Sequence, residues 1–169
     1  MKIRLFGIVK DSIVDGPGLR TAVFVQGCSH NCPGCHNPAS HDPSAGYDAD
    51  TDNILAEIAM DPLCAGITLS GGEPFEQIKP CMALARGAQA FGKSVWAYTG
   101  YTLEALRAMN NPDVEALLDE IDVLVDGPFL IGSRSLELKF RGSDNQRLID
   151  MKKTGPAGIV LWEDPWENL

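Results

Sequence analysis

The sequence predicts an α/β fold with a mostly parallel sheet, and three observations lead to this class. Short β-branched apolar runs alternate with segments of helical periodicity, joined by short links that favour right-handed crossovers. The chain has 169 residues, which suits a single domain whose core needs no disulfides. A cysteine-rich loop and the segments "SGGEP", "YTGY" and "DGPF" each follow a predicted strand, at the edge where parallel sheets bind ligands.

The first half of the chain supplies two predicted strands and two predicted helices. A β-branched run at 21–27 predicts a buried strand, and the cysteine loop at 26–38 follows it. Residues 50–62 carry apolar residues at helical spacing between an aspartate cap and a proline stop. A strand at 66–70 then runs into a glycine turn, and a helix is predicted over 76–91.

The second half continues the alternation. We expect a strand at 94–100, two capped helices at 102–109 and 111–120, and another strand at 121–129. A half-exposed edge strand is expected at 135–140, and a last strand in the tail at 158–169. The edge strand is predicted because Leu136, Leu138 and Phe140 alternate with polar residues.

Composition limits the kinds of partner. The chain is 44% hydrophobic and 22% charged, with a formal charge of −9, which argues against nucleic acid or an anionic membrane as the main partner. No segment resembles a signal peptide or a membrane span, so we expect a cytoplasmic protein. Five cysteines, three of them crowded together, favour a metal centre over disulfides.

The loop "QGCSHNCPGCHNP" carries Cys28, Cys32 and Cys35 at C-x3-C-x2-C spacing. We favour a four-iron cluster held by these thiolates over three free thiols or a zinc site. A zinc site would need a fourth ligand, for which the loop and its surroundings offer His30, His36 and His41.

The two remaining cysteines are not expected to bind the metal. Cys64 lies between a helix stop and a strand, and Cys81 lies within a predicted helix as a small buried residue. One iron is therefore expected to have no protein ligand, and an open metal position is where a cofactor can bind.

This cysteine spacing resembles the signature of the radical S-adenosylmethionine superfamily. The resemblance implies that the amino and carboxylate groups of S-adenosylmethionine chelate the fourth iron. One electron from the cluster then breaks the S–C5′ bond and gives a 5′-deoxyadenosyl radical. It also implies that residues 1–169 form one radical SAM domain, an incomplete (βα) barrel whose curved, mostly parallel sheet is open on one side.

Further segments narrow the resemblance. "DGPGLRTAVFVQGC", at 15–28, is similar to the start of activating enzymes for glycyl-radical proteins. "VWAYTGY", "VLVDGPF" and "FRGSDNQRLID" together resemble the activating proteins of anaerobic ribonucleoside-triphosphate reductase. The implied reaction removes a glycine α-hydrogen from the large subunit of the class III reductase, with a flavodoxin-type electron donor. Alternatives are an activase of another glycyl-radical enzyme, such as pyruvate formate-lyase, and a non-catalytic iron–sulfur electron carrier.

The resemblance also assigns cofactor contacts. Gly71, Gly72 and Glu73 of "SGGEP" match the motif that holds the amino group of S-adenosylmethionine. Many relatives have an aromatic residue just before the third cysteine, where this chain has Gly34. Adenine is then expected to meet the backbone of Gly34 and Cys35, with the ring of His36 alongside.

One further acid is a candidate. Asp126 ends a predicted strand, where it could accept a hydrogen bond from the cofactor, bind a cation or cap the turn.

Other residues are predicted to face the protein partner. Asp15 and Gly16 belong to a rigid turn that we interpret as a lip of the site, and Arg20 follows it. Residues 141–169 are a candidate docking extension. A basic group in this acidic chain is the second docking hypothesis, and it consists of Arg134, Lys139, Arg141 and Arg147.

Overall fold

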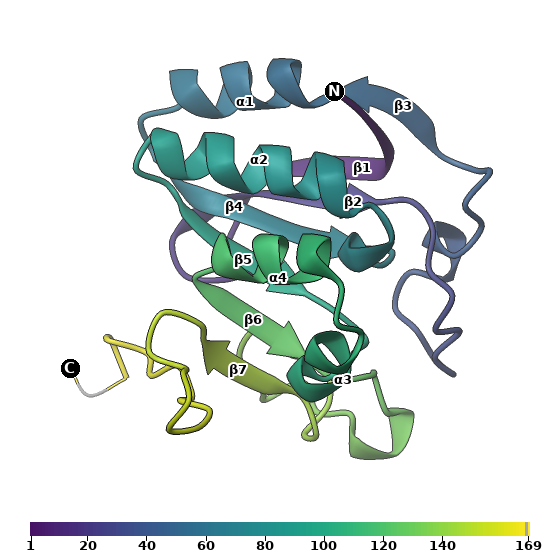
Figure 1. Cartoon of the computed structure of the whole chain (residues 1–169), viewed down its shortest axis with the longest axis vertical. Helices are drawn as coiled ribbons and strands as arrows, with labels where there is room; N and C mark the ends of the chain where they lie inside the picture. Colours follow the sequence, from purple (N-terminus) through teal and green to yellow (C-terminus); the bar gives the residue numbers. More distant parts are fainter. Residues whose placement is uncertain (168) are drawn as a thin grey trace.

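The computed structural model describes residues 1–167 and 169, and it contains one sheet of seven strands in the order β3-β1-β2-β4-β5-β6-β7 (Figure 1). The strands are β1 Lys2–Ser12, β2 Leu19–Val25, β3 Tyr47–Asp50, β4 Cys64–Gly71, β5 Ser94–Tyr98, β6 Val123–Asp126 and β7 Arg147–Asp150. The four central strands, β2, β4, β5 and β6, are parallel, as predicted. The outer strands β1, β3 and β7 are antiparallel to their neighbours, so the sheet is mixed and does not close.

The helices form where local signals predict them. They are α1 Thr51–Met60, α2 Ile78–Ala90, α3 Leu103–Ala108 and α4 Pro112–Asp119, with short 3-10 turns η1 Pro38–Ser40, η2 Pro74–Glu76 and η3 Ile131–Ser133. Asp50, Thr102 and Asn111 each accept a hydrogen bond from a backbone N–H of the first turn, as an N-cap does. Within the described residues, no helix has the length and apolar character needed to cross a bilayer.

Alternate residues of the central strands face two different layers. Helices α1, α2 and α4 lie side by side against one face, where they cover buried strand residues such as Val23, Leu69 and Val95 (Figure 1). On the opposite face, Trp96, Val123 and Val125 are packed by aromatic and aliphatic residues of the C-terminal third. That second face, away from the helices, also carries the candidate site.

The predicted edge strand at 135–140 is wrong. These residues form turns, and the edge position beside β6 is taken by β7, which pairs Asp126 with Arg147 and Leu124 with Ile149. The alternating apolar residues at 135–140 therefore do not form a strand, whereas the less regular segment 147–150 pairs with β6. In the part of the tail that the structure describes, residues 158–167 and 169 form two isolated bridges, Gly155–Gly158 and Ile149–Leu161, and no strand, so the predicted last strand is also wrong.

The N-terminal strands β1 and β3 extend the sheet beyond the predicted set. Ile3 and Leu5 are buried while Lys2 is exposed, which is the alternation of a half-covered strand. Register shifts between Leu5 and Gly7, and between Val9 and Ser12, interrupt this pattern. The irregular pairing explains why periodicity alone did not reveal the strand.

Candidate metal and cofactor site

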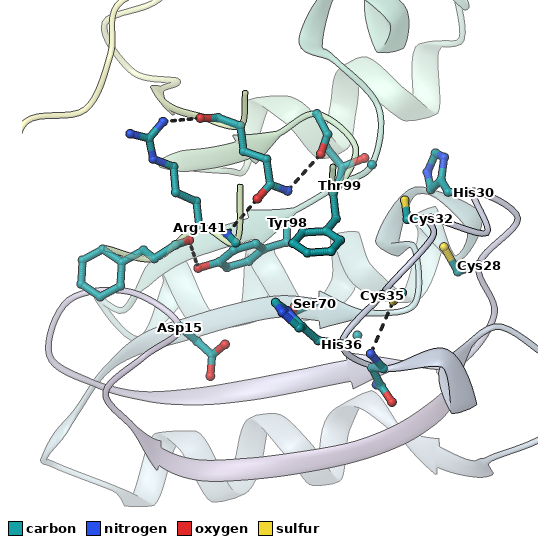
Figure 2. A pocket seen from close by; sticks show the side chains of 18 of the residues that line it. Asp15, Cys28, His30, Cys32, Cys35, His36, Ser70, Tyr98, Thr99 and Arg141 are labelled. Carbon is teal, nitrogen blue, oxygen red and sulfur yellow. Dashed lines mark hydrogen bonds between the residues drawn. The ribbon is translucent and has the colours of Figure 1, made fainter. Parts of the chain in front are cut away.

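A cavity of about 720 Å³ lies on the face of the sheet away from the helices (Figure 2). Its floor includes Phe24 of β2, Ser70 of β4 and Tyr98 of β5. The cysteine loop follows the end of β2, while Asp15 precedes its start, and both line the cavity. The cavity is therefore lined by the loops on both sides of β2 in the sequence.

The segments predicted to share one edge of the sheet do so. The cysteine loop, "SGGEP", "YTGY" and "DGPF" follow the parallel strands β2, β4, β5 and β6, and each contributes to the cavity wall. This is the edge at which open α/β sheets place their ligands.

The three predicted metal ligands face this cavity. Cys28, Cys32 and Cys35 are half-buried, unpaired by disulfides and line the cavity together (Figure 2). Burial raises the pKa of the Cys28 thiol to about 11, with Glu73 and Glu76 adding to the shift. Within residues 1–167 and 169, no three acidic, histidine or cysteine side chains are gathered closely enough to hold one metal ion as they stand.

The donor set fits an iron–sulfur cluster better than a closed zinc site. Three soft thiol donors on one irregular loop match the ligand type of such clusters. A zinc site would need a histidine from nearby. His30 instead directs its Nε2 to Glu73 at 2.6 Å, and the His36 ring packs against Phe129.

The base of the cysteine loop is tied to the rest of the protein by backbone hydrogen bonds. The amide of Gly27 donates to the carbonyl of Ser40 at 2.7 Å, and that of Cys28 donates to His41 at 3.1 Å. The amide of Ser29 donates to Glu76 Oε1 at 2.9 Å. The loop is therefore fixed at its start, while the thiols lie on its cavity side.

The glycines of "SGGEP" allow β2 and β4 to approach closely. A Cβ on Gly71 would lie 2.6 Å from the Cα of Phe24, and one on Gly72 would lie 2.3 Å from the carbonyl oxygen of Gly27. The amides of Gly72 and Glu73 donate to the carbonyls of Val25 and Gly27, both at 2.8 Å. The turn is thus joined directly to the start of the cysteine loop.

Glu73 is fully buried, and both of its carboxylate oxygens accept hydrogen bonds within the protein. Oε2 accepts from the His30 ring at 2.6 Å and from the Gly100 amide at 2.9 Å. Oε1 accepts from the Phe75 amide at 3.0 Å, and the Thr99 hydroxyl lies 3.0 Å from both oxygens.

This arrangement gives Glu73 a positioning role. The hydrogen bond to Glu73 raises the pKa of His30 above its ordinary value. The carboxylate connects the cysteine loop to the turn after β5, and its acceptors are already engaged by groups of the protein. Glu73 also lines the cavity, so its contact with a cofactor amine stays a prediction.

Gly34 and His36 contact a segment that the sequence interpretation overlooked. Gly34 has a φ of +73°, and a Cβ there would lie 2.5 Å from Cδ1 of Ile131. The His36 ring is 4.8 Å from the ring of Phe129, centroid to centroid. Both partners belong to the connection between β6 and β7. The signal for this segment in the sequence was the "DGPF" turn, of which only Asp126 was chosen as a candidate site residue.

Asp126 lies outside the cavity lining, which is a correction to the predicted cofactor contact. It is 1% exposed, and its Oδ1 accepts from Arg147 Nε at 3.0 Å. Its Oδ2 accepts from the amide of Leu103 at 2.8 Å, at the start of α3. The hydrogen bonds to Asp126 and Glu104 raise the pKa of Arg147. Asp126 thus joins β6, β7 and α3.

Arg20 is not available to a partner, because it is 1% exposed. Its guanidinium donates to Thr68 Oγ1 at 2.8 Å, to the carbonyl of Ile67 at 2.7 Å and to Ser94 Oγ at 2.9 Å. It also lies 5.7 Å from the centre of the Trp96 ring, and burial lowers its pKa to about 10. Five donors in a fixed fork suit such a buried network.

The predicted lip is divided between surface and interior. Asp15 lines the cavity, where its carboxylate accepts from the Ser12 hydroxyl. Gly16 is buried above Arg20. Only the first of these two residues is therefore placed to meet a ligand.

The predicted basic group is also divided. Arg147 is paired with Asp126 and Glu104, and Lys139 with Asp164. Arg134, Arg141 and Lys139 line the cavity, whereas Arg147 does not.

The segment "FRGSDNQ" forms a folded wall beside the cavity. The side chain of Gln146 accepts from the amides of Gly142 at 2.9 Å and Ser143 at 3.2 Å, and it donates to the carbonyl of Gly127 at 3.1 Å. Arg141 Nη1 donates to the backbone carbonyl of Gln146 at 2.6 Å. Figure 2 shows this network above Tyr98, whose hydroxyl donates to the carbonyl of Phe140.

Comparisons with known proteins bear on the same region. A family described as "4Fe-4S single cluster domain" matches residues 14–149. A protein of Salmonella typhimurium is 37% identical over 142 residues, covering 79% of this chain and 90% of the relative. One of Enterobacteria phage T4 is 33% identical over 144 residues, covering 80% and 86%. Both relatives are named anaerobic ribonucleoside-triphosphate reductase-activating protein.

Proposed function

The chain belongs to the family of anaerobic ribonucleoside-triphosphate reductase-activating proteins, and from this premise we propose that it is a radical S-adenosylmethionine enzyme. Its substrate is the large subunit of a class III reductase, in which it generates a glycyl radical. The observation that carries the proposal is the convergence of three thiols and a glycine turn on one 720 Å³ cavity.

Cys28, Cys32 and Cys35 hold a [4Fe-4S] cluster through their thiolates. When bound, the cluster and S-adenosylmethionine would supply a one-electron cleavage of the S–C5′ bond, after which the 5′-carbon would take the α-hydrogen of the glycine. The overall products would be methionine, 5′-deoxyadenosine and a glycyl radical on the partner. The electron comes from an external donor of the flavodoxin type. The protein contributes the position of the reacting groups and the exclusion of water.

The other cavity residues orient the cofactor. The methionyl amino group is received by the backbone of Gly71 and Gly72 and by Glu73, all three of which line the cavity. The adenine lies against the backbone of Gly34 and Cys35, beside the His36 ring, which the contact with Phe129 supports from behind. Backbone acceptors and an aromatic edge suit an amine and a planar base.

The fold suits a macromolecular substrate. Helices cover one face of the sheet (Figure 1). The cavity lies on the other face, and this arrangement supports the proposal of an incomplete (βα) barrel of the radical SAM type. An open sheet leaves an approach for a segment of another protein, whose glycine must come into contact with the reacting atom.

Anaerobic reconstitution with iron and sulfide tests the proposal. We expect about four irons per chain, and we expect 5′-deoxyadenosine when S-adenosylmethionine and dithionite are added. Addition of the class III reductase should then produce the EPR doublet of a glycyl radical. A cluster that forms but yields no 5′-deoxyadenosine would point to an electron carrier instead.

Cysteine variants supply the matched control. Cys32→Ala should abolish the production of 5′-deoxyadenosine, because the cluster loses a thiolate. The Cys64→Ser protein should keep its iron, because Cys64 lies on β4, where it is buried against Gly66 and against Thr21 of β2. Equal iron and turnover in both variants would contradict the ligand assignment.

A further inference from the structure

Exposed aliphatic side chains line the cavity from two separate segments. Ile13 and Val14, in the loop between β1 and β2, are 69% and 70% exposed. Leu136, in the connection between β6 and β7, is 86% exposed and lines the same cavity. We call these three residues the aliphatic rim. Single exposed aliphatic residues are ordinary, but several around one cavity mark a contact surface.

The loop that carries two of the three rim residues is held from beneath by buried groups. The carbonyl of Asp15 accepts from Thr68 Oγ1 at 2.6 Å, and the carbonyl of Pro17 accepts from Arg20 Nη1 at 3.3 Å. Both donors belong to the interior network on the sheet face. The two aliphatic side chains are therefore presented by an anchored loop, which lowers the ordering cost of binding a partner.

The cysteine loop and the loop that carries Ile13 and Val14 line the same cavity. The cysteine loop follows the end of β2, and the loop with Ile13 and Val14 precedes its start. A cofactor that reacts at the cluster would lie beside the thiols. The group that reacts with this cofactor must enter the same cavity, where Ile13 and Val14 are exposed.

Charge at the cavity differs from that of the whole chain. The chain has a formal charge of −9, yet Arg134 and Arg141 line the cavity together with the aliphatic rim. Of the acids on the lining, Glu73 is fully buried and Asp15 is held by Ser12. A partner segment with acidic residues is attracted here, while the rest of the acidic surface repels it.

We infer that the aliphatic rim is the docking surface for the glycine-bearing segment of the reductase, an extended peptide with apolar side chains and neighbouring acids. This inference rests on the proposed function. A glycine has no side chain, so its α-carbon can pass down the cavity while the flanking apolar residues rest on Ile13, Val14 and Leu136. Arg134 and Arg141 pair with the acids beside them.

The test measures binding of the purified class III reductase large subunit to the reconstituted protein in the presence of S-adenosylmethionine. The double variant Ile13→Glu/Val14→Glu and the single variant Leu136→Glu should each raise Kd at least tenfold. Met60→Glu is the matched control, since Met60 is 84% exposed on α1, and its Kd should stay within twofold. Replacement of Ile13 and Val14 by leucine should preserve binding, and circular dichroism checks the fold of each variant.

The outcomes separate this inference from the proposed function. If the wild-type protein forms the glycyl radical and the rim variants bind the reductase as tightly as it does, the docking surface is elsewhere. If the wild-type protein is a dimer that the rim variants convert to monomers, the rim is covered by a second copy and the inference is overturned. If the rim variants lose binding but the wild-type protein forms no radical, the docking surface stands and the proposed chemistry fails.

Discussion

Replacement of Glu73 by glutamine tests whether this acid positions the cysteine loop. Glu73 is fully buried, and its Oε2 accepts from His30 Nε2 and the Gly100 amide. A glutamine places an NH2 group at one of the two oxygen positions. If that position is Oε2, the Gly100 N–H faces another donor and loses its acceptor, and the hydrogen bond to His30 loses its charge.

The magnitude follows from these contacts. A buried donor left without a partner costs about 1–3 kcal/mol, and a hydrogen bond to a charged group contributes about 1.5–3 kcal/mol. We therefore expect Glu73→Gln to lower the free energy of unfolding of the cluster-free protein by about 3 kcal/mol. For a chain of this size that corresponds to a fall in Tm of roughly 6–12 °C.

Thermal unfolding of the cluster-free protein measures this effect without any cofactor. Glu57→Gln is the control, because Glu57 is an exposed partner of Lys10 and its replacement should change the stability by less than about 0.5 kcal/mol. Thr99→Val should fall between the two, since it removes only the hydroxyl that donates to Glu73. If Glu73→Gln left Tm unchanged but weakened the binding of S-adenosylmethionine, the positioning role would be refuted, and a direct contact between Glu73 and the cofactor would be supported.

Three further substitutions test the contacts that the structure gives to Arg20, Asp126 and Gly34. Arg20→Met should lower the free energy of unfolding by about 3 kcal/mol in urea, because buried acceptors lose their donor; an unchanged midpoint would contradict its burial. Asp126→Ala should cost about 2 kcal/mol through the loss of Arg147 and the α3 cap, with the Kd for S-adenosylmethionine unchanged; a weaker Kd without a loss of stability would make Asp126 a ligand. Gly34→Ala should cost about 1–3 kcal/mol from its positive φ and the contact with Ile131, and Ile131→Ala should recover part of that loss; no recovery would exclude the clash.

The parts of the fold that were predicted correctly have local causes. The helices after Asp50, Thr102 and Asn111 begin at side chains that cap their own first turns, and such signals are contained in a few residues. The parallel strands were visible as short apolar runs. Edge strands depend on pairing with distant residues, which local sequence does not reveal. Apolar and polar residues alternate at 135–140, yet this segment forms turns, and it is 147–150 that pairs with β6.

The same distinction applies to the site. The cysteine loop and the glycine turn were found because their spacing is local, and the parallel strands bring them to one cavity. Arg20 was misplaced because its partners, Thr68 and Ser94, are 48 and 74 residues away in the sequence. Phe129 and Ile131 were overlooked because the "DGPF" turn marks the end of a strand but does not indicate that the cysteine loop packs on the residues after it.

Three buried charges fix the surroundings of the cavity through contacts within the protein. Glu73 holds the cysteine loop, Arg20 holds the loop before β2, and Asp126 joins β7 to the start of α3. Each is within 1% of complete burial, where an unpaired charge would be strongly unfavourable. The loops that they anchor therefore have one preferred arrangement, which fixes the part of the cavity wall that these loops supply. For a step governed by the position of a reactive group, a rigid wall of this kind contributes more than an additional charged contact would.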